Sequence, residues 1–299
     1  MAHINAHSLT LAGKDWLTDS RHPRILHVFD QACNLINARG EVLSVVTPQI
    51  GNGPFNLVSE NEICFSKHIN LQTPISNSLN QLNLGALTLD TANASIWSPL
   101  PDWQRLYEKQ NDILNQLRSL PLTIYQAHDS DRNFAIFAHS YPTTDNLQSL
   151  IANLASAVAA ANIPACCTFA SQLAGLGIGL TPAGDDFILG AVLAARVIHP
   201  PETASSLAKE ITNTAAPLTT SLSAAWLRSA GKGEAGILWH HFFDALTAQD
   251  PMHLQEALDK INAVGETSGA DALAGFIGVV LSWMEYKQKE LTLHEDSSG

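Results

Sequence analysis

The feature that most constrains the fold is a change in sequence character near residue 145. Before this point, short β-branched and apolar runs alternate with clusters of turn residues, and after it Ala- and Leu-rich segments dominate. Short runs bounded by Gly, Pro and Asn are typical of strands, whereas apolar residues spaced three and four apart indicate helices. The sequence therefore predicts an α+β fold, with a β-rich N-terminal part followed by a mostly α-helical C-terminal part.

The same change suggests how the chain is organised. We expect an N-terminal extension (1–24), a β-rich domain (25–144), an α-helical domain with Gly/Asp motifs (145–290) and a flexible tail (291–299). Strands are predicted at 25–29, 42–47, 55–58, 63–65, 69–71, 84–89, 122–125 and 133–138, with one helix at 102–120. Further helices are predicted at 146–161, 165–174, 186–198, 204–230, 234–248, 252–264 and 270–289. Several of these are apolar on most of their surface, which is typical of helices inside a bundle.

Composition argues against two kinds of partner. Asp and Glu number 28 against 16 Lys and Arg, which gives a formal net charge of -12. Nucleic acids and anionic membrane surfaces both attract basic residues, so we expect neither as a partner. The longest apolar stretches, at 188–198 and 276–284, are shorter than the ~20 residues of a membrane-spanning helix.

The cysteines and the N-terminus suggest a compartment. The four cysteines are Cys33, Cys64, Cys166 and Cys167, and they show no CxxC spacing. Such a set is too sparse for a disulfide framework. The first residues form no continuous apolar segment of the kind found in signal peptides. We therefore expect a reduced, cytoplasmic protein.

The most unusual segment is the Gly-rich sequence GLGIGLTPAGDDF at 175–187, which lies between two predicted helices. Glycines permit positive φ and close backbone approach to a ligand, and the start of a helix favours anions. The segment is not a dinucleotide or Walker loop: Leu180 replaces the third Gly of GxGxxG, and Asp185 and Asp186 replace the Walker Lys and Ser/Thr. A simple turn in which Asp185 is the N-cap would leave the surplus glycines unexplained, so we favour a ligand site.

A second segment repeats part of this pattern. The spacing Gly-x-Asp-x-x-x-Gly occurs at 184–190 and again at 269–275, and each copy follows a Gly-x-Thr sequence. Within each copy the Asp and the second Gly lie four apart on one helix face, so the Gly clears space beside the Asp for a helix or a ligand. We predict that 179–186 and 267–271 lie side by side and line one polar pocket. The alternative is two capped helices in a bundle.

These segments supply most of the candidate site. The candidate catalytic residues are Asp186, Asp271 and Asp185, and the candidate substrate-binding residues are Gly179, Thr181, Gly184, Thr267, Ser268, Gly269, Lys232 and Asn34. The carboxylates suit an amide NH₂, a Mg²⁺ ion or proton transfer. Lys232 lies in a Gly-Lys-Gly sequence that we expect to be a mobile loop, and Asn34 lies in the β-rich part. Thr219 and Ser223 face either this site or the carbonyls of their own helix.

The sequence predicts no obligatory cofactor. A Mg²⁺ ion bound by the candidate carboxylates is the one cofactor that stays open. His240 and Asp244 have metal-ligand spacing, but no third ligand accompanies them. We therefore assign no metal ligands, and we expect no bound nucleotide, haem or structural zinc.

The two Gly/Asp motifs together resemble the AllH-like family, which includes a subunit of oxamate carbamoyltransferase and was formerly a domain of unknown function. The resemblance extends from about His27 to Trp283 and is looser in the N-terminal half. Glu266 is a departure, because His is more usual there in the family. The Ser-Thr-Arg-Thr and His-Pro-x-Gln signatures of the common carbamoyltransferases do not occur in this sequence.

The resemblance implies a role in allantoin degradation, a part of purine catabolism. The reaction that the resemblance implies is the interconversion of carbamoyl phosphate and oxamate with oxalurate and phosphate. The AllH-like chain works in it with other protein subunits. The leading hypothesis is such a transferase subunit, or a homologue acting on a similar small anionic substrate. Two others stay open: a non-catalytic small-ligand-binding or assembly subunit, and a Mg²⁺-dependent enzyme acting on another phosphorylated metabolite.

Overall fold

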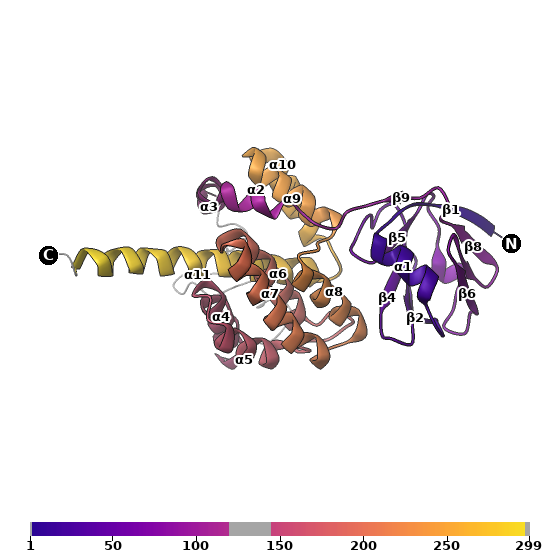
Figure 1. The fold of residues 1–299 in the computed structure, drawn as a ribbon, viewed down its shortest axis with the longest axis horizontal. Coiled ribbons are helices and arrows are strands. Elements are labelled where there is room, and N and C mark those ends of the chain that lie inside the picture. The colour runs from indigo at the N-terminus through magenta and orange to yellow at the C-terminus, as the bar shows by residue number, and fades with distance from the viewer. Residues whose placement is uncertain (1, 120–144, 297–299) are drawn as a thin grey trace. The chain divides into compact units, whose positions relative to one another are not determined.

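The computed structural model describes residues 2–119 and 145–296 and divides the chain into two units (Figure 1). Unit 1 comprises Met1–Leu100 with Ala235–Ile237, and unit 2 comprises Pro101–Glu234 with Leu238–Gly299. In the described residues, strands and one α-helix make up unit 1 and helices make up unit 2, which confirms the predicted α+β fold. The division falls at Leu100 and not near residue 145, because the segment after Pro101 packs among the helices.

Unit 1 is built on one nine-stranded sheet. Its strands are β1 (Ala2–Leu9), β2 (Arg24–Val28), β3 (Ala32–Ile36), β4 (Val42–Val46), β5 (Asn56–Ser59), β6 (Ile75–Ser78), β7 (Gln81–Leu84), β8 (Leu87–Asp90) and β9 (Ser95–Ile96). The order is β2-β3-β4-β5-β1-β8-β7-β6, and β9 pairs with β1. One face carries the apolar core, which includes Leu9, Leu35, Leu43, Leu57, Leu82 and Leu89.

The first residues, which the sequence assigns to an extension at 1–24, form the middle of this sheet. β1 pairs antiparallel with β5 and parallel with both β8 and β9. The alternation of buried and exposed residues along β1 is easy to miss in the sequence, because the buried positions include the small residues Ala6 and Ser8, while His3 and His7 are exposed. Strand order is set by long-range pairing, which local sequence does not reveal.

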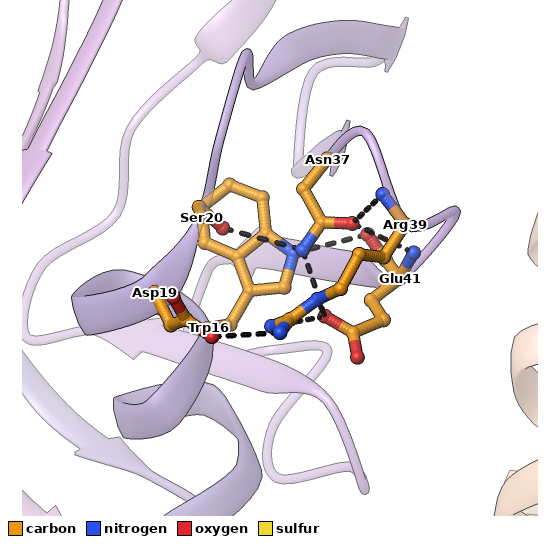
Figure 2. Close-up of polar contacts among 6 residues, drawn as sticks. All are labelled: Trp16, Asp19, Ser20, Asn37, Arg39 and Glu41. Carbon is orange, nitrogen blue, oxygen red and sulfur yellow. Dashed lines mark hydrogen bonds and ion pairs between the residues drawn. The ribbon is translucent and has the colours of Figure 1, made fainter.

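Polar contacts fasten helix α1 (Leu11–Asp19) to the turn between β3 and β4 (Figure 2). The Trp16 indole N–H donates to the Glu41 carbonyl at 3.0 Å. The Arg39 guanidinium pairs with the Asp19 carboxylate at 2.6 Å and with the Glu41 carboxylate at 2.9 Å. The side-chain amide of Asn37 also donates to the Glu41 carboxylate, at 2.8 Å. These contacts make α1 an integral part of unit 1.

Three predicted strands in this part differ from the structure. The runs at 63–65 and 69–71 are irregular segments next to a short 3₁₀ segment, η1 (Phe65–Lys67), and each buries a single side chain, Phe65 or Ile69, where a strand would bury alternate ones. The run at 84–89 is the hairpin of β7 and β8. The predicted strands at 122–125 and 133–138 lie outside the described residues.

Unit 2 is a bundle of helices. They are α2 (Trp103–Glu108), α3 (Gln110–Ser119), α4 (Asp145–Ala159), α5 (Ile163–Leu173), α6 (Ala183–Ile198), α7 (Pro201–Ala215), α8 (Ser221–Lys232), α9 (Ile237–Ala248), α10 (Pro251–Asn262) and α11 (Ser268–Asp296). The predicted helix at 204–230 is two helices, separated by a 3₁₀ turn, η4 (Ala216–Leu218), which contains Pro217. The predicted helix at 102–120 is likewise broken, at Lys109. The last helix, α11, continues to Asp296, into the segment 291–299 that is predicted as a tail.

Helices α6 and α11 form the centre of the bundle and lie against each other (Figure 1). A Cβ atom at Gly190 would lie 1.8 Å from the Ala272 carbonyl oxygen, and one at Gly275 would lie 2.0 Å from the Phe187 carbonyl oxygen. The two glycines therefore allow the helix backbones to touch, and the space beside each Asp is filled by the neighbouring helix. Within the described residues, no helix combines the length and apolar character needed to cross a membrane.

Candidate acidic site

The two Gly/Asp segments meet at the first turns of α6 and α11. The Thr181 hydroxyl and the Ser268 hydroxyl are hydrogen-bonded at 2.8 Å. Asp186 lies in the first turn of α6, and Asp271 lies in the first turn of α11. The structure thus brings the segments side by side, as their shared spacing predicts. That they line one ligand pocket stays a prediction.

The Gly-rich loop (residues 175–182) connects α5 to α6. Gly175 and Gly177 have backbone φ angles of 73° and 128°, which residues with a Cβ atom rarely adopt. A Cβ at Gly177 would also lie 2.6 Å from the Ala183 nitrogen, so the loop is tightly folded against the start of α6. Towards its other end, the Leu180 carbonyl accepts a hydrogen bond from the Thr220 hydroxyl at 2.6 Å.

Two of the predicted substrate-binding glycines have a packing role in the structure. A Cβ at Gly184 would lie 2.1 Å from the Leu173 carbonyl oxygen, and a Cβ at Gly269 would lie 1.7 Å from the carbonyl oxygen of Ile261. Their backbone N–H groups donate within the chain, at 2.9 Å for Gly184 and 3.1 Å for Gly269. Gly179 is different, because it is exposed and has no atom within 4 Å of its Cβ position.

Asp185 is not the N-cap of α6, a position that Pro182 occupies. It lies inside the first turn, 1% exposed, and its carboxylate reaches away from the helix. The carboxylate accepts hydrogen bonds from the Gly175 N–H at 2.9 Å, from the Ser223 hydroxyl at 2.8 Å and from the Thr219 hydroxyl. The two hydroxyls therefore face this segment and do not bond the carbonyls of their own helix. The sequence left these two orientations of Thr219 and Ser223 open, and it gave no signal that the Asp185 carboxylate is their acceptor.

Asp186 and Asp271 are buried without adequate partners. Asp186 is 8% exposed and its Oδ2 has no hydrogen-bond partner, and Asp271 is fully buried with no hydrogen bond of ordinary geometry at either oxygen. No ion pair in the described parts of the chain involves either residue. Burying an ionised carboxylate without hydrogen-bond donors costs on the order of several kcal/mol of solvation free energy. Such a group therefore takes up a proton or is compensated by a bound ligand.

Burial dominates the electrostatics of this acidic pair. Desolvation raises the pKa of Asp186 to about 8, and the negative charges of Asp271 and Asp185 add to the rise, while the Ser268 and Thr181 hydroxyls oppose it. Desolvation also raises the pKa of Asp271 to about 6, and the nearby Thr267 hydroxyl opposes the rise. Both carboxyls of the pair therefore titrate well above the usual range of an aspartate, because burial disfavours their charged forms and their charges repel each other.

The remaining two predicted binding residues are Lys232 at the end of α8 and Asn34 in unit 1. Lys232 is the exposed last residue of α8, and Gly233 caps that helix in the left-handed conformation, so the Gly-Lys-Gly sequence is a packed helix end and not a mobile loop. The Arg196 guanidinium donates to the Gly231 carbonyl at 2.9 Å, which fixes this end. Asn34 lies on β3 in unit 1, where its side-chain oxygen accepts from the Ser44 hydroxyl at 2.6 Å. A substrate-binding role for Lys232 or Asn34 stays a prediction.

The acidic site consists of two carboxylates and their neighbouring hydroxyls. In the described parts of the chain, no group of three or more His, Cys, Asp or Glu side chains is arranged to hold a metal ion. Magnesium is often held by only one or two protein carboxylates together with substrate phosphates. The donor set thus suits proton transfer and hydrogen bonding, and it would supply only part of a Mg²⁺ coordination shell.

The fold and the site together define a two-part protein, in which a β-rich unit accompanies a helical unit with an acidic pair at two helix starts. Residues 5–96 match the family model for the AllH family N-terminal domain, and residues 173–280 match the model for oxamate carbamoyltransferase subunit AllH. These two matches cover most of the chain, and the chain belongs to the AllH family of oxamate carbamoyltransferase subunits. No solved structure matches it.

Proposed function

We propose that this chain contributes the acidic site to a heteromeric oxamate carbamoyltransferase, which interconverts carbamoyl phosphate and oxamate with oxalurate and phosphate in allantoin degradation. The observation that carries the proposal is the set of buried carboxylate oxygens without donors at Asp186 and Asp271, inside the region that matches the AllH model. Oxamate and the carbamoyl group both present NH₂ groups, which are the donors that such oxygens lack.

The chemistry needs one proton acceptor and one proton donor. The oxamate nitrogen attacks the carbamoyl carbon, a C–N bond forms, and the C–O bond to phosphate breaks with its electron pair leaving on the phosphate oxygen. Ionised Asp271 accepts the proton from the attacking nitrogen, and protonated Asp186 donates its proton to the departing phosphate. Two carboxyls whose pKa values are raised towards neutral pH suit this exchange, because general acids and bases work best with a pKa near the working pH.

Other subunits complete the enzyme in this proposal, and we propose that the complex is cytoplasmic. The matched family is named as a subunit, which supports the existence of partner chains. The acidic pair brings no cation of its own to the phosphate, since no ion pair of the described residues includes it. We therefore expect a partner chain, or a Mg²⁺ ion carried by the substrate, to supply positive charge.

The test is oxalurate phosphorolysis by the complex reconstituted from this chain and its partner subunits. We expect Asp186→Asn and Asp271→Asn each to lower kcat by at least a hundredfold, the scale of a lost acid or base. Asp244→Asn, a change at an exposed carboxylate on α9, is the matched control and should keep full activity. Full activity in both site variants would contradict the proposal.

Ligand binding to the isolated chain separates the alternatives. A ligand that binds the folded state raises the melting temperature, so the chain is melted with oxamate, oxalurate, carbamoyl phosphate, phosphate and Mg²⁺. Stabilisation by oxamate or oxalurate that disappears in Asp186→Asn supports the transferase site. Binding without turnover in the full complex would indicate a ligand-binding or assembly subunit. Phosphate release that needs Mg²⁺ but not oxamate would indicate a different phosphorylated substrate.

A further inference from the structure

We propose that Asp185 is a positioning residue: it holds the Gly-rich loop in the conformation that brings Thr181 to Ser268 beside the acidic pair. The inference rests on the proposed function only where it concerns catalysis. Its structural content, which is the link between one buried carboxylate and the loop, stands on the hydrogen bonds of the isolated chain.

Three donors from two separate segments converge on the Asp185 carboxylate. The Gly175 N–H comes from the first residue of the loop, and the Thr219 and Ser223 hydroxyls come from the start of α8. Hydrogen bonds to an ionised acceptor are stronger than neutral ones, and here they are also shielded from water, since Asp185 is 1% exposed. Because no cation pairs with this carboxylate in the described residues, these donors compensate its charge.

The same segment of α8 also holds the far end of the loop. Thr220, which lies between the two Asp185 donors, donates its hydroxyl to the Leu180 carbonyl at 2.6 Å. The middle of the loop is exposed by contrast: Ile178 is 79% exposed, and nothing lies within 4 Å of the Cβ position of Gly179. Each end of the loop thus has a hydrogen bond to a side chain, and at its first residue that side chain is Asp185.

The position of Thr181 follows from these attachments. Thr181 lies one residue beyond Leu180, and its hydroxyl meets Ser268 at 2.8 Å. Both hydroxyls also act on Asp186, whose pKa they lower against the effect of burial. Loosening the loop at Asp185 would therefore displace a hydroxyl from the acidic pair while leaving Asp186 and Asp271 in place on their helices.

Amide hydrogen exchange on the intact chain tests the structural part. Asp185→Ala removes all three acceptor contacts, and we expect exchange of the Gly175 and Gly184 amides to accelerate at least tenfold. Asp185→Asn should have a smaller effect, since the Thr219 and Ser223 hydroxyls can rotate to accept from the new amide. Asp186→Asn is the matched control, and the loop amides should keep their protection. If Asp185→Ala fails to fold, Ser223→Ala removes a single donor and gives the same comparison.

The assay of the reconstituted complex tests the catalytic part. Loss of a positioning residue that does not touch the reacting atoms should raise KM at least fivefold in Asp185→Ala and leave kcat within twofold, with a smaller rise of KM in Asp185→Asn, whereas Asp186→Asn lowers kcat. Unchanged amide exchange of the loop in both Asp185→Ala and Ser223→Ala would overturn the inference. An unchanged KM in a variant whose loop amides exchange faster would overturn it as well. If the wild-type complex has no transferase activity, the proposed function fails, and the exchange comparison still decides the role of Asp185.

Discussion

Two adjacent aspartates have opposite environments in this protein. Asp185 accepts three hydrogen bonds, whereas Asp186, the next residue, has a buried oxygen without any donor. The difference arises because successive helix positions point about 100° apart, so one side chain faces α8 and the other faces α11. Residue type and sequence position alone therefore do not assign a role to either acid.

The stability of single variants should separate these roles. Asp186→Asn and Asp271→Asn remove buried charges without partners, so we expect unfolding free energies equal to wild type or higher by on the order of 1 kcal/mol at pH 8. Asp185→Ala should instead lower the unfolding free energy by about 1–3 kcal/mol, because it leaves buried donors unsatisfied. Chemical denaturation of the three variants measures both effects. A loss of stability in both Asn variants would show that these acids serve the fold.

The raised pKa values of the acidic pair also predict how stability depends on pH. In the unfolded chain these carboxyls titrate near 3.8, and in the folded chain their pKa values are about 6 and about 8. The folded state therefore holds its protons more tightly, so the contribution is complete below about pH 4 and is lost as pH rises towards 8. We expect the unfolding free energy of wild type, relative to Asp186→Asn, to fall between pH 5 and pH 8. Denaturant titrations at these two pH values test it, and a flat difference would contradict the raised pKa.

At the scale of elements, the contact between α6 and α11 depends on two glycines. Gly190→Ala and Gly275→Ala would place a Cβ within 2.0 Å of backbone carbonyl oxygens. These oxygens are fixed in a helix backbone, so no side-chain rotation can relieve the clash. We expect each to lower the unfolding free energy by about 2–3 kcal/mol, the upper part of the usual range for overpacking. Both should also weaken ligand binding, because the helices that carry Asp186 and Asp271 must separate.

Gly13→Ala is the matched control for these substitutions. Gly13 is a buried glycine in α1, and its added Cβ would meet its nearest atoms at 3.5 Å, which is ordinary contact. Because Ala has the higher helix propensity, we expect this variant to be unchanged or more stable by about 0.5–1 kcal/mol. Thermal melts of the three variants make the comparison. Equal melting temperatures would mean that α6 and α11 adapt to the added atoms.

At the scale of the molecule, unit 1 is close to self-sufficient. Its nine strands and apolar core lie within residues 1–100. The later segment Ala235–Ile237 adds two backbone hydrogen bonds, from Ala235 to the Pro99 carbonyl at 2.8 Å and from Ile237 to the Asn52 carbonyl at 2.9 Å. We expect a fragment of residues 1–100 to fold with a β-type circular dichroism spectrum and to melt cooperatively below the full chain. An unfolded fragment would show that this later segment is essential.

The sequence determined the fold class and the pairing of the two motifs. The short β-branched run at 42–47 and the long apolar segment at 186–198 are local properties, and such local patterns distinguish this strand from this helix. The shared spacing around Asp186 and Asp271 likewise indicated two similar helix starts, which the Thr181–Ser268 contact joins. The family resemblance arose from the same two motifs, and the match at 173–280 includes both.

Only the tertiary structure decided what each residue of these motifs does. The central place of β1 depends on pairing with β5 and β8, and the environment of Asp185 depends on donors at 175, 219 and 223, which no local pattern links. Gly184 and Gly269 became packing residues because other backbone segments lie against them. The physical reason is common to all three cases. Burial, close approach and hydrogen-bond compensation depend on residues distant in sequence, so they exist only once the chain has folded.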